Sequence, residues 1–340
     1  MTGAGRLTAV LLAVLAWLAA PAAAQDSYLL VIVGLGGSQE HRELFHRWAS
    51  DLVEAATARY GLARDHVIYL GEREEVDGVD SRSTREGVGQ AVERIASRAR
   101  PGDRVFVVLF GHGSFANGES RFNLPGPDLT AAEFAVLLDR LAAQTVAFVN
   151  TASASGGFIE ALAARDRAVL TATRTGGERN ETLFGGFFVE ALATGEGDLD
   201  KDGRVSMLEG FTWAKRRVAE AYSKEGLLLT EHATLEDNAD GKGSLDPDAM
   251  AGDGALARTL VMRGAAADPA AATDDPELKL LLEKKRDLED RVARLRLTKD
   301  RMKPDEYARD LERLLVDLAR TSRAIRERAA GRNGARGRGR

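Results

Sequence analysis

Short apolar runs alternate with segments of helical periodicity along the first two thirds of the chain. The apolar runs span residues 28–33, 66–70, 104–110, 145–150 and 168–173. Strands that alternate with helices form mainly parallel sheets with helices on both faces. The sequence therefore predicts an α/β fold.

The helices expected between these strands have apolar residues at helical spacing and recognisable first residues. Thr130 can cap one of them, and Ser83 or Thr84 can cap another. The expected helices cover residues 40–60, 84–99, 130–143 and 183–193, with a further one that starts at residue 156 or 157. A last strand is expected at 257–262.

Composition narrows the class of protein. The 340 residues are 44% hydrophobic and 29% charged, with a formal net charge of -5, which suits a globular protein with a sizeable core. This charge gives no reason to expect a nucleic-acid partner. The chain has no cysteine, which excludes disulfides and thiol chemistry.

The first 24 residues have the layout of a secretory signal peptide. Arg6 precedes an apolar run at 7–20, and small residues at 21–24 precede Gln25. The alternative is an uncleaved anchor, for which this run is short. No later run reaches a membrane-spanning length of about 18 apolar residues. We therefore expect an exported chain, periplasmic or extracellular, with no transmembrane segment after residue 24.

Two glycine-bounded segments follow neighbouring strands of the expected sheet. Strand 104–110 leads into Gly-His-Gly, which contains His112 and Gly113, and strand 145–150 leads into Thr-Ala-Ser-Ala-Ser-Gly-Gly, which contains Ser153. The carboxyl ends of parallel strands are where open α/β sheets build their sites. The histidine and the serine are thus expected to face one crevice.

Acyl transfer needs a nucleophile, a base and donors for the developing oxyanion. Ser153 can be the nucleophile, His112 the base, and the backbone N–H of Gly113 an oxyanion donor. A serine, unlike a thiol, generally needs a base that a third group orients, and no acidic residue is identified for that role. Arg174 and Glu178 either line the same crevice or lie on a solvated loop, and each glycine-bounded segment taken singly can be only a tight turn.

The order of these segments resembles the caspase-like and legumain-like (asparaginyl) peptidases, from residue 28 to 218. The resemblance rests on the His-Gly and Ser-x-Ser-Gly segments and on Ala-Val-Leu-Thr-Ala-Thr-Arg at 168–174. The segments at 33–37 and 122–126 are further similar to a bacterial exported subgroup of the legumain-like proteins. In these families the histidine is the base and a cysteine is the nucleophile, so Ser153 stands in the position of that cysteine.

The resemblance implies a caspase/hemoglobinase-like fold with a peptide or protein ligand in the crevice. Because Ser153 replaces the cysteine, it implies a catalytically inactive pseudopeptidase with a binding or regulatory role. One alternative is an active hydrolase of peptide bonds with Ser153 as nucleophile and His112 as base. Another is an envelope scaffold that works through the carboxyl-terminal helices.

The strongest local motif is an acidic twelve-residue segment at 198–209 that fits the calcium loop of an EF-hand. Gly203 makes the sharp turn at the sixth position, and helical spacing flanks the segment on both sides. The oxygen ligands would come from Asp198, Asp200, Asp202, the backbone carbonyl of Arg204, Ser206 and Glu209. The sequence predicts a Ca²⁺ site here, with an acidic turn that binds no metal as the alternative. A second acidic segment at 236–243 lacks a glutamate at the twelfth position from Asp237, so it is at best half of a metal site, and the sequence favours a turn.

The α/β domain is expected to cover 25–263 and to be followed by a linker at 264–275. Leucines then recur every seven residues on both sides of Lys303-Pro304, which predicts a helical hairpin at 276–330. Its seam can pack on its own partner helix, on the sheet domain or on a second copy of the chain. The last ten residues, 331–340, are expected to be a disordered basic tail.

Overall fold

The computed structural model of the chain describes residues 25–201, 203–248, 252–264, 273, 275–297 and 302–337. The predicted signal peptide at 1–24 and most of the predicted linker at 264–275 lie outside these residues. So does Asp202 of the acidic loop.

The predicted α/β fold is confirmed. Seven strands form one sheet in the order β10-β9-β8-β4-β1-β2-β3, parallel except for β10. The strands are β1 (Ser27–Val33), β2 (Val67–Gly71), β3 (Ser81–Arg82), β4 (Arg104–Phe110), β8 (Thr145–Asn150), β9 (Arg167–Thr171) and β10 (Thr234–Glu236).

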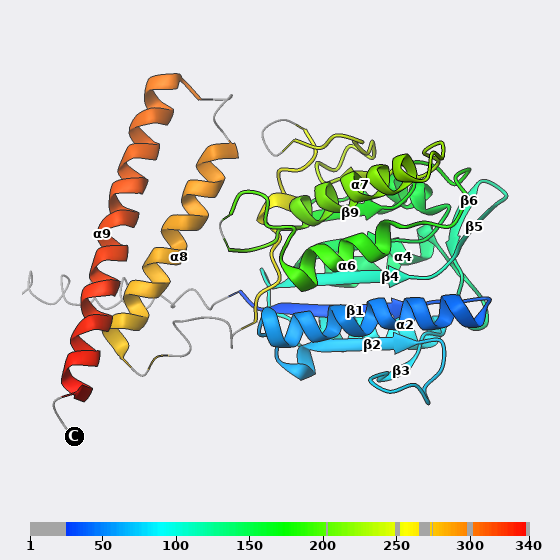
Figure 1. Ribbon diagram of the computed structural model, residues 1–340, viewed down its shortest axis with the longest axis horizontal. Helices are drawn as coiled ribbons and strands as arrows, with labels where there is room; N and C mark the ends of the chain where they lie inside the picture. The colour runs from blue at the N-terminus through cyan, green and yellow to red at the C-terminus, as the bar shows by residue number, and fades with distance from the viewer. Residues whose placement is uncertain are drawn as a thin grey trace, which may run out of the picture.

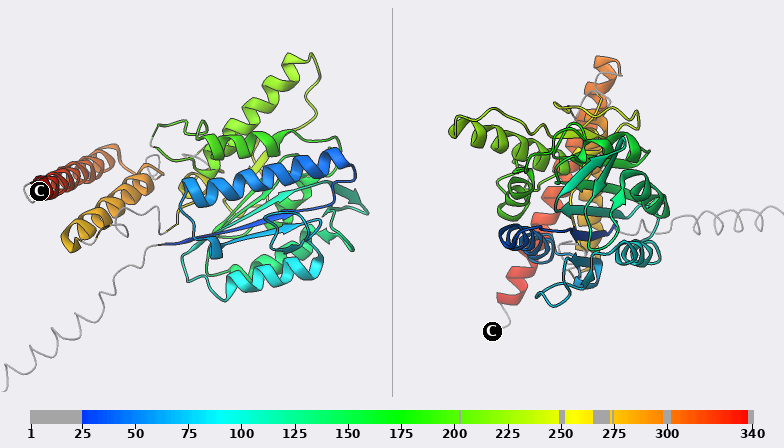
Figure 2. Two further views of the ribbon diagram at one scale, coloured as in Figure 1. Left: turned by 60° about the horizontal axis from the view of Figure 1, so that its bottom comes forward. Right: turned by 90° about the vertical axis from the view of Figure 1, so that its right-hand side faces the viewer.

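Helices cover both faces of this sheet (Figure 2). One core contains side chains of α2, α6 and α7, and the other contains side chains of α3, α4 and α5. The helices are α2 (Gln39–Glu54), α3 (Arg85–Ala96), α4 (Ala131–Leu138), α5 (Phe158–Leu162), α6 (Phe184–Thr194) and α7 (Met207–Lys224).

Alternate residues of β1 explain why the sheet is buried on both sides. Leu29 and Val31 belong to one core, and Leu30 and Ile32 to the other. All four are completely buried. Continuous apolar strands of this kind are typical of parallel sheets that helices cover on both faces.

The structure differs from the sequence-based expectation in two segments. Between residues 113 and 130, where no strand is predicted, there is a small antiparallel sheet of β5 (Gly113–Ala116), β6 (Glu119–Phe122) and β7 (Leu129–Thr130). The strand expected at 257–262 is wrong. A short 3-10 turn, Ala257–Thr259, stands there, because the Asp237 carboxylate accepts the backbone N–H groups of Gly254 and Ala257 at 2.8 Å each.

The carboxyl-terminal hairpin consists of α8 (Pro276–Leu297) and α9 (Pro304–Gly337). Both helices begin with a proline, which is tolerated in the first turn. Figure 1 shows the two helices side by side at the end of the sheet where β1 begins, away from β5 and β6. Residues 331–337, expected to be a disordered tail, fall within α9.

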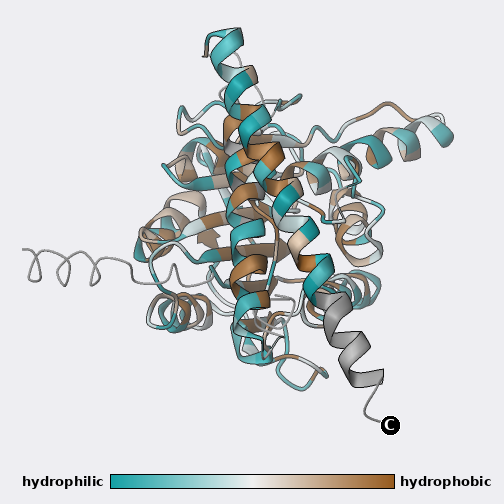
Figure 3. Cartoon of the chain, turned by 90° about the vertical axis from the view of Figure 1, so that its left-hand side faces the viewer, coloured by the Kyte–Doolittle hydropathy of each residue, from teal (hydrophilic) through white to brown (hydrophobic). Residues whose placement is uncertain are grey.

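The apolar residues of the hairpin form a small cluster of their own, built around Leu288, Val292 and Leu314. In Figure 3 hydrophobic residues gather where the two helices meet. Self-packing of the hairpin, one of the predicted arrangements, is thus observed. Among the described residues, no helix is both long and apolar enough to cross a membrane.

Candidate functional site

His112 and Ser153 follow paired strands at equal distances. In the register of β4 and β8, Leu109 lies opposite Asn150. His112 comes three positions after Leu109, and Ser153 comes three positions after Asn150. The Thr151 backbone N–H donates to the Leu109 carbonyl at 3.2 Å and extends the pairing toward the site. The two predicted segments therefore share the carboxyl edge of the sheet.

The Ser153 hydroxyl lies against the backbone of Gly113. The hydroxyl oxygen accepts the Gly113 N–H at 3.4 Å, and the hydroxyl O–H donates to the Gly113 carbonyl at 3.3 Å. The residue is only 5% exposed. Gly113 is required for this approach, because a Cβ there would lie 2.1 Å from the Ser153 carbonyl oxygen. The structure thus joins Ser153 to Gly113 through hydrogen bonds, whereas the sequence analysis expects the Gly113 N–H as a donor to an oxyanion.

His112 is held by a different partner. Its Nε2 lies 3.2 Å from the Gly36 carbonyl oxygen. A carbonyl oxygen can only accept, so Nε2 carries the proton and the lone pair of the neutral ring is on Nδ1. Burial, and then the nearby His41, lower the pKa of His112 below its usual value. The imidazole is therefore neutral near pH 7, as a general base must be.

His41 is a site residue that the sequence does not reveal. Its ring stands edge-on to the His112 ring, with centroids 4.8 Å apart. Nε2 of His41 lies 2.6 Å from a carboxylate oxygen of Glu181, and Nδ1 lies 2.9 Å from the Ser38 hydroxyl. It lies 71 residues from His112 in the sequence, so no local spacing indicates that the two rings meet.

The turn after Ser153 is strained. Ala154 adopts a left-handed backbone conformation with φ 54°, which is unfavourable for a residue with a Cβ. Its N–H donates to the Glu178 carbonyl at 2.7 Å. Strained residues gather at functional sites, where the surrounding structure holds them in place.

Glu178 connects this turn to the edge strand β10. Its carboxylate accepts the backbone N–H groups of Arg174 and His232 at 3.1 Å each, and it lies 3.1 Å from Nδ1 of His232. Of the two residues proposed to line the crevice, Glu178 thus contacts the Ser153 turn, whereas Arg174 is exposed. His232 is partly buried as the partner of Glu178.

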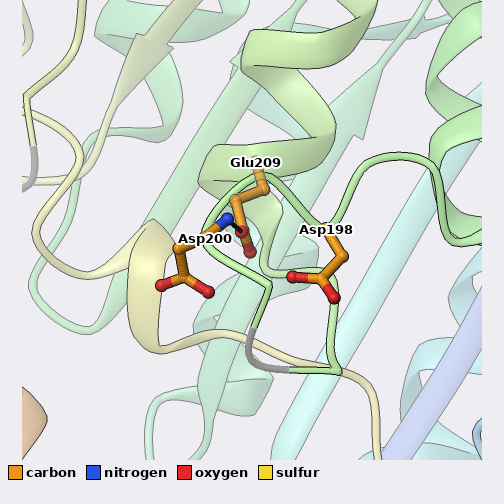
Figure 4. A group of neighbouring side chains, drawn as sticks. All are labelled: Asp198, Asp200 and Glu209. Atoms are coloured by element: carbon orange, nitrogen blue, oxygen red, sulfur yellow. Dashed lines mark hydrogen bonds between the residues drawn. The ribbon is translucent and has the colours of Figure 1, made fainter.

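The acidic loop places three of its predicted ligands together. Oxygens of Asp198, Asp200 and Glu209 lie within 4.8 Å of one another, and this is the one such group of His, Cys, Asp or Glu side chains among the residues described. Figure 4 shows the three side chains around the turn that precedes α7. Calcium prefers carboxylate oxygens in this kind of arrangement.

Backbone hydrogen bonds inside the loop define its conformation. The Gly203 N–H donates to the Asp198 carboxylate at 3.0 Å, and Gly203 has φ 88°. The Glu209 carboxylate accepts the N–H groups of Leu199 and Ser206 at 3.0 Å and 2.9 Å. Ser206 itself is buried and caps α7 in a capping box with Glu209.

The loop is also attached to the segment that precedes the linker. Ser206 forms a single β-bridge with Val261, and the Met207 N–H donates to the Leu260 carbonyl at 2.9 Å. Nη2 of Arg258 lies 3.9 Å from Oδ2 of Asp200. These contacts fix the loop against the body of the domain.

No protein-family model matches this chain, and no curated protein matches it either. The geometry of the site alone therefore carries the functional argument.

Proposed function

We propose that this chain is a peptidase-like protein that binds a peptide or protein segment at the carboxyl edge of its sheet without cleaving it. The observation that carries this proposal is the bonding of Ser153. Its hydroxyl accepts a hydrogen bond from the Gly113 N–H and donates one to the Gly113 carbonyl. His112 donates instead to the Gly36 carbonyl. A nucleophilic serine needs the base as its partner.

The arrangement around the histidine supports the same conclusion. A catalytic histidine needs an acidic residue that orients its ring. Glu181 is an acidic residue of this kind, but it pairs with His41 and not with His112. The group that would orient a catalytic histidine is thus attached to the neighbouring ring. The edge strand β5, which begins at Gly113, supplies backbone groups that an extended peptide can pair with.

An introduced thiol tests this proposal, because the chain has no other cysteine. A Ser153→Cys thiol is expected to react with iodoacetamide at pH 7 about ten-fold more slowly than free cysteine, since burial without an activating partner disfavours the thiolate. Adding His112→Ala is expected to leave that rate unchanged. Ser223→Cys, exposed at the end of α7, is the reactive control.

A rate above that of free cysteine that falls when His112 is replaced would overturn the proposal. It would favour the alternative of an active hydrolase. That alternative has one specific observation in its favour, the neutral His112 with a free Nδ1 lone pair beside the strained Ser153 turn.

We further propose that the loop at 198–209 binds Ca²⁺ as a structural ligand of the α6–α7 pair. The converging oxygens of Asp198, Asp200 and Glu209 support this. Ca²⁺ is expected to raise the thermal midpoint of the full chain, since an ion that binds only the folded state stabilises it. Glu209→Gln is expected to reduce that rise, and Glu225→Gln, exposed at the end of α7, to leave it unchanged. An equal rise in wild type and Glu209→Gln would exclude this loop.

A further inference from the structure

Helix α9 carries a second row of residues, apart from the side that packs on α8. The side that packs on α8 contributes Leu311, Leu314 and Leu318 to the small core of the hairpin. The members of the second row recur three or four positions apart, which places them on one face of the helix. We call this row the outer strip, and all of its members are exposed. They are Asp305, Ala308, Glu312, Leu315, Val316, Ala319, Arg323 and Arg326.

The centre of the outer strip is apolar and open. Leu315 and Val316 are 42% and 41% exposed. A shallow groove runs along this part of α9, lined by Tyr307, Ala308, Leu311, Glu312, Leu315, Val316 and Ala319. In Figure 1, α8 lies between α9 and the α/β domain. The domain of the same chain therefore does not cover this groove.

The hairpin has a small core for its length. Its two helices span Pro276–Leu297 and Pro304–Gly337, yet the cluster between them has three buried side chains, those of Leu288, Val292 and Leu314. Units with so little buried apolar surface usually need additional support, of which oligomerisation is one kind. A further helix packed on the outer strip would supply additional buried surface.

The charges of the outer strip identify what can pack there. Asp305 and Glu312 lie on the amino-terminal side of its apolar centre, and Arg323 and Arg326 lie on the carboxyl-terminal side. An antiparallel second copy of α9 would bring each acidic half beside a basic half. A parallel copy would bring like charges together, and flanking charges set the orientation of paired helices in this way. The strip is thus complementary to itself in the antiparallel orientation.

We infer that the outer strip is a dimer interface, on which α9 of a second copy of this chain packs antiparallel. Asp305 and Arg326 are equally far from a point between Leu315 and Val316. A two-fold axis at this point puts Asp305 opposite Arg326 of the second copy, and the apolar centres on each other. Because a helix rises 1.5 Å per residue, Glu312 then lies about 6 Å along the axis from Arg323 of the second copy, within reach of an arginine side chain.

Sedimentation of the full chain at concentrations of about 1–100 µM tests this interface. Wild type is expected to shift from monomer to dimer over this range. Leu315→Glu and Val316→Glu are each expected to raise the dissociation constant at least about ten-fold, because the new charge would be buried against its own copy. Leu280→Glu makes the same change at a leucine of α8 that is 65% exposed and outside the strip, and it is expected to keep the wild-type constant. A wild type that stays monomeric, or an equal effect of Leu280→Glu, would overturn the interface.

A charge exchange separates the interface from a general effect on the helix. Glu312→Arg and Arg323→Glu are each expected to weaken the dimer, and the double variant, which exchanges both charges, to recover most of the wild-type affinity. Arg323 also pairs with Glu327 of its own helix at 2.7 Å, so circular dichroism must show the same helix content in all four proteins. A double variant that is as weak as the weaker single variant would contradict the antiparallel pairing.

The orientation has its own readout, because the chain contains no cysteine. Val316→Cys lies beside the proposed two-fold axis and is expected to form a disulfide with its own copy under mild oxidation. Asp305→Cys is expected to form none, because its copy would lie about 30 Å away along the helix axis. Disulfide dimers of both variants in equal yield would indicate a parallel pair and overturn the proposed arrangement.

Discussion

Single residues of the site differ in how far the sequence reveals them. Gly113 and Ser153 stand next to strand ends, so their proximity follows from the order of elements. His41 and Glu178 reach the site from a helix and from a loop after another strand. Their contacts depend on how α2 and the 174–178 turn pack, and no local pattern encodes that packing.

Gly113→Ala tests the closest backbone contact of the site. A Cβ at Gly113 would lie 2.1 Å from the Ser153 carbonyl oxygen, so one of the two turns must move. Overpacking of this kind costs roughly 1–3 kcal/mol of unfolding free energy. Urea denaturation measures the loss. Gly177→Ala, where the new Cβ would be 3.4 Å from its nearest neighbour, is the control, and an equal effect of both changes would refute the argument.

Helices and long buried strands can be predicted from this sequence, whereas short strands outside the centre of the main sheet cannot. Thr130, which caps α4 in a capping box, marks a helix start that the sequence already indicates. The β5-β6 hairpin was missed because its strands of four residues contain polar side chains and no clear alternation. Strand β10 was missed for a similar reason, since it is three residues long and pairs only at the sheet edge.

Glu231, whose carboxylate lies at the start of α6, is expected to make the stability of the fold depend on pH. The Glu231 carboxylate accepts the N–H groups of Leu183 and Phe184 at 2.9 Å each, yet burial raises its pKa from 4.5 to about 7. The folded state thus binds the proton of the Glu231 carboxyl group more tightly than the unfolded state does. Stability from this group is complete below pH 4.5 and is lost as the pH rises toward 7, by roughly 3 kcal/mol.

Glu231→Gln is expected to remove this contribution to the fall of the unfolding free energy between pH 4.5 and 7. Unfolding free energies measured in urea at several pH values give the slope. The variant is also expected to be less stable at pH 5, because an amide offers one acceptor to two N–H groups. Glu225→Gln at the exposed end of α7 is expected to keep the wild-type slope. An unchanged slope in Glu231→Gln would contradict the assignment.

At the scale of the whole molecule, the α/β domain and the hairpin have separate cores. Residues of α8 and α9 form one cluster, and the sheet with its helices forms two others. Hydrophobic periodicity predicted both units, because each buries its own apolar residues. The sequence did not predict which apolar residues of the hairpin stay uncovered. Leu280, Leu315 and Val316 are 65%, 42% and 41% exposed.

Removal of residues 276–340 tests the independence of the domain. Because the hairpin has its own cluster, the thermal midpoint of the remaining chain is expected to stay within about 4 °C of the full chain, the shift that 1 kcal/mol would cause. A large fall in the midpoint would show that the hairpin packs on the sheet domain.

Labelling of the purified full chain with a fluorophosphonate, with and without Ca²⁺, tests the central claim most directly. Fluorophosphonates react with activated serines, and Ser153 bonds the Gly113 backbone instead of His112. No labelling of the folded wild-type chain is predicted in either condition. Labelling that disappears in both Ser153→Ala and His112→Ala would contradict the account and make the chain a serine-dependent hydrolase.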